Sequence, residues 1–385
     1  MAGTRPRDLR DLAKVFLRLG LLGFGGPAAV TAMMDEEVVE RRRWLTRQQF
    51  LDLIGATNLI PGPNATELAI HVGLLRAGWR GLLVAGLCFI VPGAAISGVF
   101  AWLYVHYGVL PAVQPILAGI KPAVLSVILA ALLRLAGSAL RSGPLVLIGA
   151  AAAASVLAGV DEVAALFAWA LAGTLWLARP QPEQATLVFS WPAAFGLGAV
   201  GMPAVAAPAI APTLWQLGLF FLKVGSVLYG SGYVLIAFIE GGLVTDRHWL
   251  TRQQVLDAVA VGQFTPGPFL STATFIGYLL GGVAGAMVAT AAVFLPSFVF
   301  VLGLHRVLPR LRESRWSAAF LDAVNAASLG LMAAVAVRMG LTVLVDGRSA
   351  LIALLALALL LRLQWNAAGV IAACGFLGWA ATLMR

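Results

Sequence analysis

Long apolar segments separated by short charged turns fill most of the chain. In the first half they cover roughly residues 12–34, 48–75, 81–106, 114–133, 143–159 and 163–178, and in the second half roughly 214–239, 253–279, 280–304, 317–337, 341–361 and 365–383. Apolar runs of this length are typical of helices that cross a lipid bilayer. The pattern predicts an all-α polytopic membrane protein with about 12–13 transmembrane segments.

The second half of the chain repeats the first. Shifting residues 16–63 by 205 positions places them on residues 221–268 without a gap, and 18 of these 48 pairs are identical. The run Trp44 to Gln49 returns unchanged as Trp249 to Gln254, and Thr46 in this run is the expected N-cap of the helix that follows. Farther along, an offset of 204 aligns Lys121 with Asn325 and Arg134 with Arg338. We interpret this pattern as the internal duplication of one unit.

The linker and the positive charges predict the membrane topology. The first repeat is expected at residues 1–178, a proline-rich linker at 179–212 and the second repeat at 213–385, with an apolar stretch at 193–211 that is able to cross the membrane. An extra crossing there gives the two repeats opposite orientations, as in many transporters. With the N-terminus inside, most arginine-bearing loops face the cytoplasm, although Arg41, Arg42, Arg43 and Arg47 then lie outside and count against the model.

Two Pro-Gly-Pro motifs interrupt apolar segments at matching positions. Pro61-Gly62-Pro63 lies within the second apolar segment of the first repeat, and Pro266-Gly267-Pro268 is its counterpart. Proline lacks a backbone donor and glycine favours irregular backbone, so each motif is expected to break its helix. Such a break survives in a membrane only where protein covers it or where it lines a wet cavity. Paired interruptions in two repeats point to a transporter's binding site.

A helix that restarts after such a break presents free amides and a positive dipole end, which attract anions. Neighbouring amide and hydroxyl side chains are able to donate hydrogen bonds to oxyanion oxygens. The alternative is that each motif is only a kink that lets the repeats pack. The residues predicted to bind an anion here are Asn58, Pro61, Gly62, Pro63, Asn64, Thr66, Gln263, Pro266, Gly267, Pro268, Ser271 and Thr272.

Several charged residues inside apolar segments are further candidates, because charge is costly in a membrane. Arg18 and Lys223 occupy equivalent positions, where they either bind the anion or extend to the membrane surface. Lys121 is the third cationic candidate, and its counterpart Asn325 is neutral. Glu67 follows the first break and either carries a coupling proton or pairs with an arginine.

Other recurring residues have structural explanations. Asp52 and Asp257 recur beside the shared Arg-Gln-Gln, where capping or an ion pair is the favoured role. Small residues allow membrane helices to approach closely, which predicts a packing role for the recurring glycines of the first segment. These glycines are Gly20, Gly25, Gly225 and Gly230.

The composition excludes several functional classes. Hydrophobic residues make up 61% of the 385 residues and charged residues only 11%, against about 25% in soluble domains. The net charge of +9 indicates cytoplasmic loops and attraction of an anion rather than nucleic-acid binding, because no soluble basic domain carries it. The two cysteines and four histidines lack metal-ligand spacing, and no nucleotide-binding loop occurs. We therefore expect no enzyme, metal site or cofactor.

Together these motifs resemble those of the chromate ion transporter family. The resemblance rests on Phe16 to Gly20, Phe24 to Pro27, Trp44 to Phe50 and Pro61 to Pro63, with a second copy at Phe221 to Gly225, Tyr229 to Gly232, Trp249 to Gln254 and Pro266 to Pro268. One departure is Gly230-Ser231-Gly232 in place of Gly25-Gly26-Pro27.

The resemblance implies a multi-pass carrier of the bacterial inner membrane that exports chromate by secondary active transport and confers resistance. Its expected partners are the oxyanion and the lipid bilayer, and a homodimer is left open. Sulfate or another oxyanion as cargo, and a passive anion channel, are the alternatives.

Overall fold

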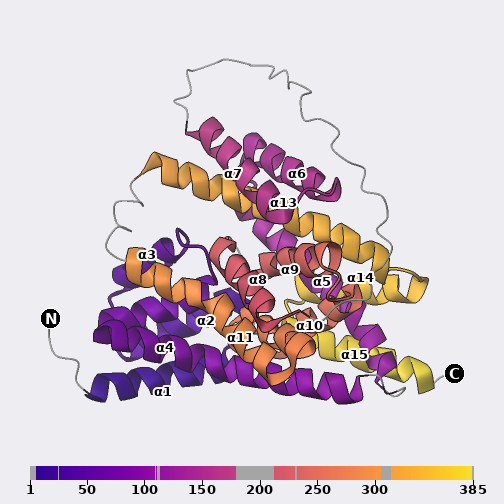
Figure 1. The fold of residues 1–385 in the computed structure, drawn as a ribbon, viewed down its shortest axis with the longest axis horizontal. Coiled ribbons are helices and arrows are strands. Elements are labelled where there is room, and N and C mark those ends of the chain that lie inside the picture. The colour runs from indigo at the N-terminus through magenta and orange to yellow at the C-terminus, as the bar shows by residue number, and fades with distance from the viewer. Residues whose placement is uncertain are drawn as a thin grey trace.

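The computed structural model describes residues 6–24, 26–108, 110, 113–178, 212–229, 232–304 and 314–383. The regular structure in these ranges is helical (Figure 1). Helices α4, α5, α11 and α13 are long and apolar enough to cross a membrane, and shorter apolar helices accompany them. The all-α polytopic membrane fold is therefore confirmed, whereas the number of crossings and the inverted topology stay predictions. The stretch 193–211 lies outside the described residues.

The two halves of the chain form the same elements in the same order. The first half contains α1 (Pro6–Leu22), α2 (Gly26–Asp35), the π-helix η1 (Glu36–Arg41), α3 (Arg47–Thr57), α4 (Asn64–Tyr107), α5 (Gln114–Ala139), α6 (Gly143–Leu157) and α7 (Glu162–Leu177). The second half contains α8 (Leu214–Val227), η2 (Gly232–Val234), α9 (Leu235–Ile239), the π-helix η3 (Glu240–Asp246), α10 (Arg252–Phe264), η4 (Phe269–Ser271), α11 (Thr272–Leu304), α13 (Arg315–Val343), α14 (Gly347–Leu361) and α15 (Ala367–Leu383).

Helices α4 and α11 each fold back on themselves at a glycine. Gly78 has φ +60° and Gly282 has φ +59°, in a region that side chains with a Cβ rarely adopt. Gly73 and Gly81 would be about 12 Å apart in a straight helix, yet a Cβ added to either would overlap the backbone of the other. Gly277 and Gly285 make the same contact in α11. Each helix is thus a hairpin of two closely packed limbs.

The two repeats exchange helices. Helix α5 of the first half packs against α14 and α15 of the second, and α13 of the second packs against α6 and α7 of the first (Figure 1). Arg134 of α5 donates a hydrogen bond to the Leu360 carbonyl oxygen at 2.7 Å. Arg338 of α13 donates to the Val156 carbonyl oxygen, and the offset of 204 relates the two arginines and also the two acceptors, Val156 and Leu360. The halves are therefore interlocked.

The identical run from Trp to Gln builds the same local structure in both repeats. The predicted N-cap at Thr46 is confirmed, because Thr46 and Gln49 form a reciprocal capping box that starts α3. Thr251 and Gln254 form the same box at the start of α10. The Trp249 amide donates to the Leu243 carbonyl oxygen at 2.8 Å, as the Trp44 amide does to Val38. This run therefore sets the entry into the helix that ends at each break.

An ion pair joins each π-helical segment to the helix that leads to the break. Arg47 of α3 pairs with Asp35 at the end of α2. Arg252 of α10 pairs with Glu240 at 2.9 Å, at the equivalent positions. The Glu240 side chain is fully buried and also contacts Arg338 at 3.2 Å, whereas the Asp35 side chain is 20% exposed. The pair in the second repeat is therefore shielded more from water.

Neutralising the two equivalent acids should have unequal effects on stability. Glu240→Gln leaves two arginines facing a buried neutral group. Removing one partner of a buried ion pair in this way lowers the free energy of unfolding by roughly 3–5 kcal/mol. Asp35→Asn weakens a more exposed pair worth about 0–1 kcal/mol. Thermal unfolding of the purified protein in one detergent should show a clearly larger fall in melting temperature for Glu240→Gln. Equal shifts would contradict the difference in shielding.

Candidate functional site

The two Pro-Gly-Pro breaks lie where the repeats meet, and each is tied to the other repeat. The Gly62 amide donates to the Leu228 carbonyl oxygen at 2.6 Å, and the Gly267 amide donates to the Gly23 carbonyl oxygen at 3.0 Å. Both donors and both acceptors are related by the offset of 205. Gly23 and Leu228 lie directly after the ends of α1 and α8, so the first apolar segment is broken as well. We call Gly23, Gly62, Leu228 and Gly267 the central joint.

Close backbone packing surrounds the central joint. A Cβ added to Gly20 would lie 2.7 Å from the Phe89 carbonyl oxygen, and one added to Gly225 would overlap the equivalent backbone at Val293. A Cβ on Gly93 would lie 2.6 Å from the Pro266 carbonyl oxygen. Gly20 and Gly225 thus lie at close helix contacts, whereas Gly25 and Gly230 lie outside the described residues.

Buried polar atoms gather at the first break. The side chains of Thr66, Glu67 and Ser297 are fully buried. The Thr66 hydroxyl has no hydrogen-bond partner among the described residues, and the Glu67 carboxylate and the Ser297 hydroxyl interact with each other but make no hydrogen bond of standard geometry there. The Glu67 carboxylate and the Ser297 hydroxyl both lie against Gly62, because a Cβ there would contact each of them. Buried polar groups usually have partners, so this cluster suits a ligand, a proton or water.

The second break has hydroxyl groups but no acid. The Ser271 side chain is fully buried and its hydroxyl has no partner in the described part of the chain. The Ser97 hydroxyl donates to the Ser271 carbonyl oxygen at 2.9 Å. Thr272, the counterpart of Glu67, donates to the Phe269 carbonyl oxygen at 2.8 Å. Gln263 is half-buried, and its side-chain amide nitrogen has no hydrogen-bond partner in the described part of the chain.

Both restarted helices begin without a side-chain cap. Pro63 is the N-cap of α4 and Pro268 is the N-cap of η4, and neither makes a capping bond. Asn64, the first residue of α4, instead donates its side-chain amide to the Asn58 side chain across the break at 2.6 Å. Uncapped first-turn amides attract anions. The amides of Gly62 and Gly267 are used in the central joint, and those of Thr66 and Ser271 donate to the carbonyl oxygens of Pro63 and Pro268, so the candidates for an anion are the amides of the first two residues of each restarted helix.

Two of the predicted cations, Arg18 and Lys223, form ion pairs of their own. Arg18 pairs with Glu37 at 3.2 Å and is 60% exposed. Lys223 lies 3.9 Å from Asp161 and is 50% exposed. Each therefore has an acidic partner near the protein surface.

Lys121 belongs to a cluster that draws on three helices. Its ammonium group on α5 interacts electrostatically with the buried carboxylate of Asp257 on α10. The Tyr104 hydroxyl on α4 donates to Asp257 at 2.8 Å. Asp52, the counterpart of Asp257, instead accepts from the Gln48 side chain at 3.2 Å. The two equivalent acids thus have different surroundings.

Sequence reasoning did not select Tyr104, Ser97 or Ser297 for the site. Ser297 was detectable, because it replaces Gly93 at the equivalent position beside the break. Tyr104 was detectable only as a polar ring in an apolar segment. Neither signal reveals which element of the other repeat lies opposite.

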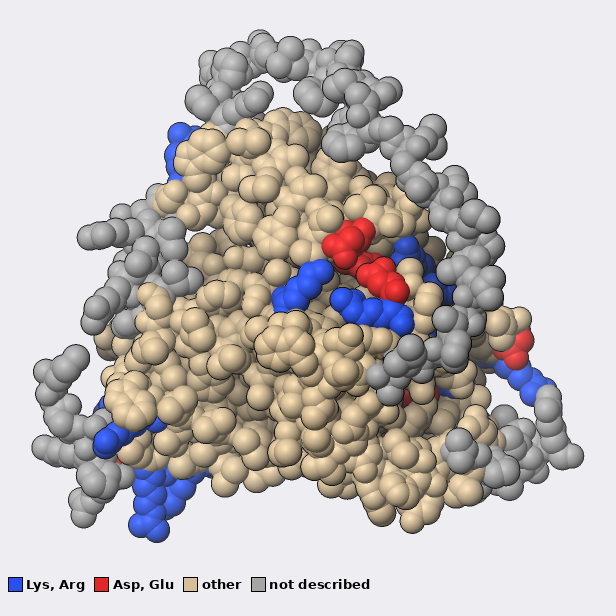
Figure 2. Space-filling model, in the orientation of Figure 1, with Lys and Arg blue, Asp and Glu red and all other residues tan. Residues whose placement is uncertain are grey.

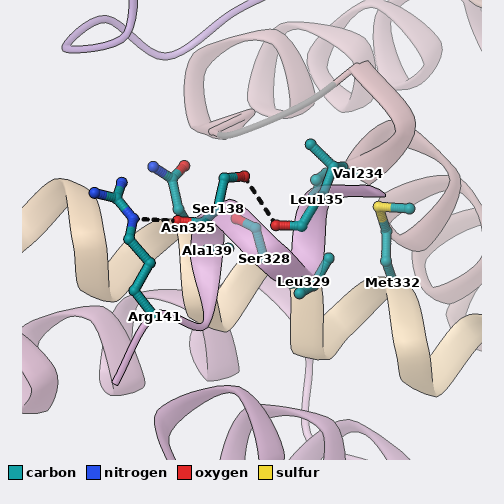
Figure 3. A pocket seen from close by; sticks show the side chains of 9 residues that line it. All are labelled: Leu135, Ser138, Ala139, Arg141, Val234, Asn325, Ser328, Leu329 and Met332. Atoms are coloured by element: carbon teal, nitrogen blue, oxygen red, sulfur yellow. Dashed lines mark hydrogen bonds between the residues drawn. The ribbon is translucent and has the colours of Figure 1, made fainter. Parts of the chain in front are cut away.

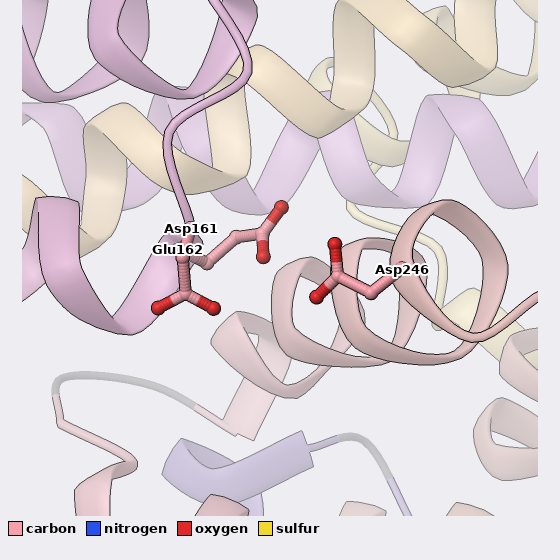
Figure 4. Close-up of side chains that lie close together, drawn as sticks. All are labelled: Asp161, Glu162 and Asp246. Atoms are coloured by element: carbon pink, nitrogen blue, oxygen red, sulfur yellow. The ribbon is translucent and has the colours of Figure 1, made fainter. Parts of the chain in front are cut away.

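Three carboxylates from the two repeats meet near the surface. The carboxylate oxygens of Asp161, Glu162 and Asp246 lie within 4.8 Å of one another (Figure 4). Lys223 lies 3.9 Å from Asp161, and Arg338 lies 3.8 Å from Glu162. These two cations offset most of the negative charge of the acids.

The outer surface suits contact with lipid. Many large apolar side chains are exposed, among them Leu341 at 80%, Val345 at 77% and Val283 at 65%. The visible face is largely free of charged residues, apart from a few clusters (Figure 2). A soluble monomer rarely exposes apolar area on this scale.

Comparison with known proteins places the chain among transporters. The family model described as "Chromate transporter" matches residues 10–176 and again residues 215–379. A chromate transport protein of Cupriavidus metallidurans is 34% identical over 365 residues, covering 92% of this chain and 88% of that protein. A chromate transport protein of Pseudomonas aeruginosa is 32% identical over 394 residues, covering 97% and 92%.

More distant matches reach another domain of life. An uncharacterized transporter of Methanocaldococcus jannaschii is 27% identical over 337 residues, covering 85% of this chain and 83% of that protein. No solved structure matches the chain. The matches of the family model to both halves, together with the identity to curated relatives over most of their length, show that this chain belongs to the chromate transporter family.

Proposed function

We propose that this chain is a secondary active transporter that exports chromate across the bacterial inner membrane and so confers chromate resistance. Two relatives similar over most of their length are named chromate transport proteins. The observation that carries the proposal is the central joint, where each uncapped helix start is tied to the other repeat and lies beside buried hydroxyls that lack a partner of standard geometry in the described structure. Amides and hydroxyls are donors, which is what an oxyanion requires.

Glu67 couples the anion to a proton in this proposal. Its carboxylate lies beside Gly62 at the start of α4, where the oxyanion would bind. Two unit negative charges about 4 Å apart repel by roughly 4 kcal/mol at an effective dielectric constant of 20. A protonated Glu67 removes this repulsion and adds a donor beside Thr66 and Ser297. The anion therefore binds with a proton and leaves when the proton does.

The membrane potential supplies the direction of transport. A divalent oxyanion that leaves with one proton carries one net negative charge outward. An inside-negative potential favours that movement by about 2.3 kcal/mol per 100 mV. Export is thus driven electrically even though the accompanying proton moves against its gradient.

Flux in proteoliposomes tests the proposal. Purified protein should move radiolabelled chromate with saturation and counterflow, and an imposed potential should accelerate flux away from the negative compartment. Sulfate added in excess measures whether the site distinguishes between these oxyanions. Flux that neither saturates nor shows counterflow would identify a channel, and absence of chromate movement would reject the proposal.

Glu67→Gln should remove the dependence of flux on a pH gradient. Glutamine keeps the shape and a hydrogen-bond donor of protonated Glu67, but it does not take up or release a proton. Each transport cycle of the variant therefore moves two net negative charges. Flux in imposed potentials should become steeper with voltage and insensitive to the pH gradient, measured at alkaline pH where chromate stays divalent. Glu36→Gln, which alters a half-exposed acid paired with Arg41, is the control and should behave as wild type. Proton coupling that persists in Glu67→Gln would assign the proton to another group.

Variants of Lys121 and Asp257 separate two roles of Lys121: an electrostatic attraction of the oxyanion, and the stabilisation of the protein through its pairing with Asp257. Lys121→Met should reduce flux and also lower stability, because it leaves the buried Asp257 carboxylate without its cation. Adding Asp257→Asn should restore the melting temperature, since the pair is then removed together. We expect flux to stay low in the double variant if Lys121 contributes positive potential to the oxyanion path. Recovery of flux along with stability would make Lys121 purely structural.

A further inference from the structure

A cavity of about 160 Å³ lies where the end of α5 meets the middle of α13 (Figure 3). Ser138 and Arg141 border it from the α5 side, Asn325 and Ser328 from α13, and Val234 from η2. The share of liquid water taken by one molecule is about 30 Å³. The cavity therefore has room for an ion of several oxygen atoms.

Ser328 contributes a buried hydroxyl that nothing in the described structure satisfies. The residue is 2% exposed and lines the cavity, and its Oγ has no hydrogen-bond partner among the described residues. Leaving a buried hydroxyl unpaired is unfavourable, because the group loses its hydrogen bonds to water and gains none in the protein. The equivalent residue in the other repeat is Val124, which is fully buried. The fold therefore accepts an apolar side chain at this place, and packing does not explain the hydroxyl of Ser328.

Arg141 and Asn325 add strong donors to the same cavity. The Arg141 Nε donates to the Ser138 carbonyl oxygen at 2.6 Å, which orients the guanidinium group (Figure 3). Its Nη2 atom forms an ion pair with Asp322 at 4.0 Å, so a bound oxyanion shares the guanidinium with this half-exposed carboxylate. A guanidinium, an amide and a hydroxyl together form a donor set that suits a tetrahedral oxyanion.

This donor set is not imposed by the duplication. The counterparts of Arg141 and Asn325 in the other repeat are Val345 and Lys121. The arginine comes from the first repeat, and the amide and the buried hydroxyl come from the second. The symmetry-related place, between the end of α13 and the middle of α5, has Val345, Lys121 and Val124 instead, so this combination of donors requires its own explanation.

The cavity adjoins the second break. Val234, which borders the cavity, directly follows Tyr233. The Tyr233 ring packs on Phe269 with 5.2 Å between ring centroids, and Phe269 follows Pro268 of the break. At the other end, Arg141 is 68% exposed in the loop between α5 and α6. The cavity thus lies between an exposed loop and a residue next to the Tyr233–Phe269 contact at the second break.

We propose that this cavity is a loading site that binds an inorganic tetrahedral oxyanion before it reaches the central joint. The Arg141 guanidinium, the Asn325 amide and the Ser328 hydroxyl hold the ion. The inference rests on the proposed function only for the identity of the cargo. Sulfate and molybdate serve as probes of the site, because they share the tetrahedral shape and do not oxidise thiols as chromate does.

Protection of an introduced thiol tests the site directly. Ser328→Cys is made in full-length protein whose Cys88 and Cys374 are replaced by alanine, and its reaction with methyl methanethiosulfonate is followed in nanodiscs of zwitterionic lipid. At an oxyanion concentration about ten times the dissociation constant, labelling should slow about tenfold. Thr342→Cys, at the counterpart of Ser138 in the other repeat, is the matched control and should label at an unchanged rate. Chloride at equal ionic strength should protect neither position.

The other outcomes overturn the inference. Equal labelling with and without oxyanion, equal protection at both positions, or no labelling of Ser328→Cys at all would each reject the site. Protection that requires anionic phospholipid rather than sulfate would assign the donors to a lipid phosphate and reject the loading role.

A transport measurement separates this inference from the proposed function. Ser328→Val copies the counterpart residue, so the variant should fold, and it should raise the KM for chromate about tenfold or more while the maximal flux is kept. Thr342→Val is the control. Unchanged KM in Ser328→Val would reject the loading site and leave chromate transport intact. Absence of chromate flux in the wild type, with thiol protection by sulfate retained, would reject the proposed function and leave the site.

Discussion

A helix that breaks inside a membrane must find partners for the backbone groups that it frees, because lipid offers none. In this chain each repeat supplies a partner for the break of the other. The Gly62 amide reaches the Leu228 carbonyl oxygen, and the Gly267 amide reaches the Gly23 carbonyl oxygen. The exchange of α5 and α13 between the repeats brings the same interlocking to the outer helices. Neither repeat satisfies its own break, so the two halves depend on each other for a stable interior.

The proposed sites coincide with differences between the equivalent residues of the two repeats. Glu67 is matched by Thr272, Ser297 by Gly93 and Ser328 by Val124. The shared positions, such as the capping boxes and the arginines at 134 and 338, hold the architecture together. The unmatched positions place an acid and hydroxyls at the first break and a donor set beside the second. A carrier of one anion and one proton needs one titrating group, which a strictly symmetric pair of repeats would supply twice.

Local patterns in the sequence predicted the helices, the two breaks and the capping residue Thr46, because turn chemistry and hydrophobic periodicity act over a few residues. They did not predict that Gly62 contacts Leu228, since an offset of 205 shows that two segments are alike but not that they meet. For the same reason the acidic partners of Arg18 and Lys223, and the position of Asp257 beside Lys121, were not apparent. The predicted anion-binding role of the breaks remains a proposal, and the structure adds Ser297 to the groups around it.

The most direct test of the account replaces one Pro-Gly-Pro motif at a time with three alanines and measures chromate binding and flux in the reconstituted protein. Alanine supplies the missing donor and favours helix, so the helix runs through and the freed amides are consumed within it. The account predicts that either replacement leaves an inserted, monodisperse protein whose affinity for chromate falls by about two to four orders of magnitude, as expected when two charge-assisted hydrogen bonds are lost. Near-native affinity and flux in either variant would show that the motifs are only kinks and would contradict the account.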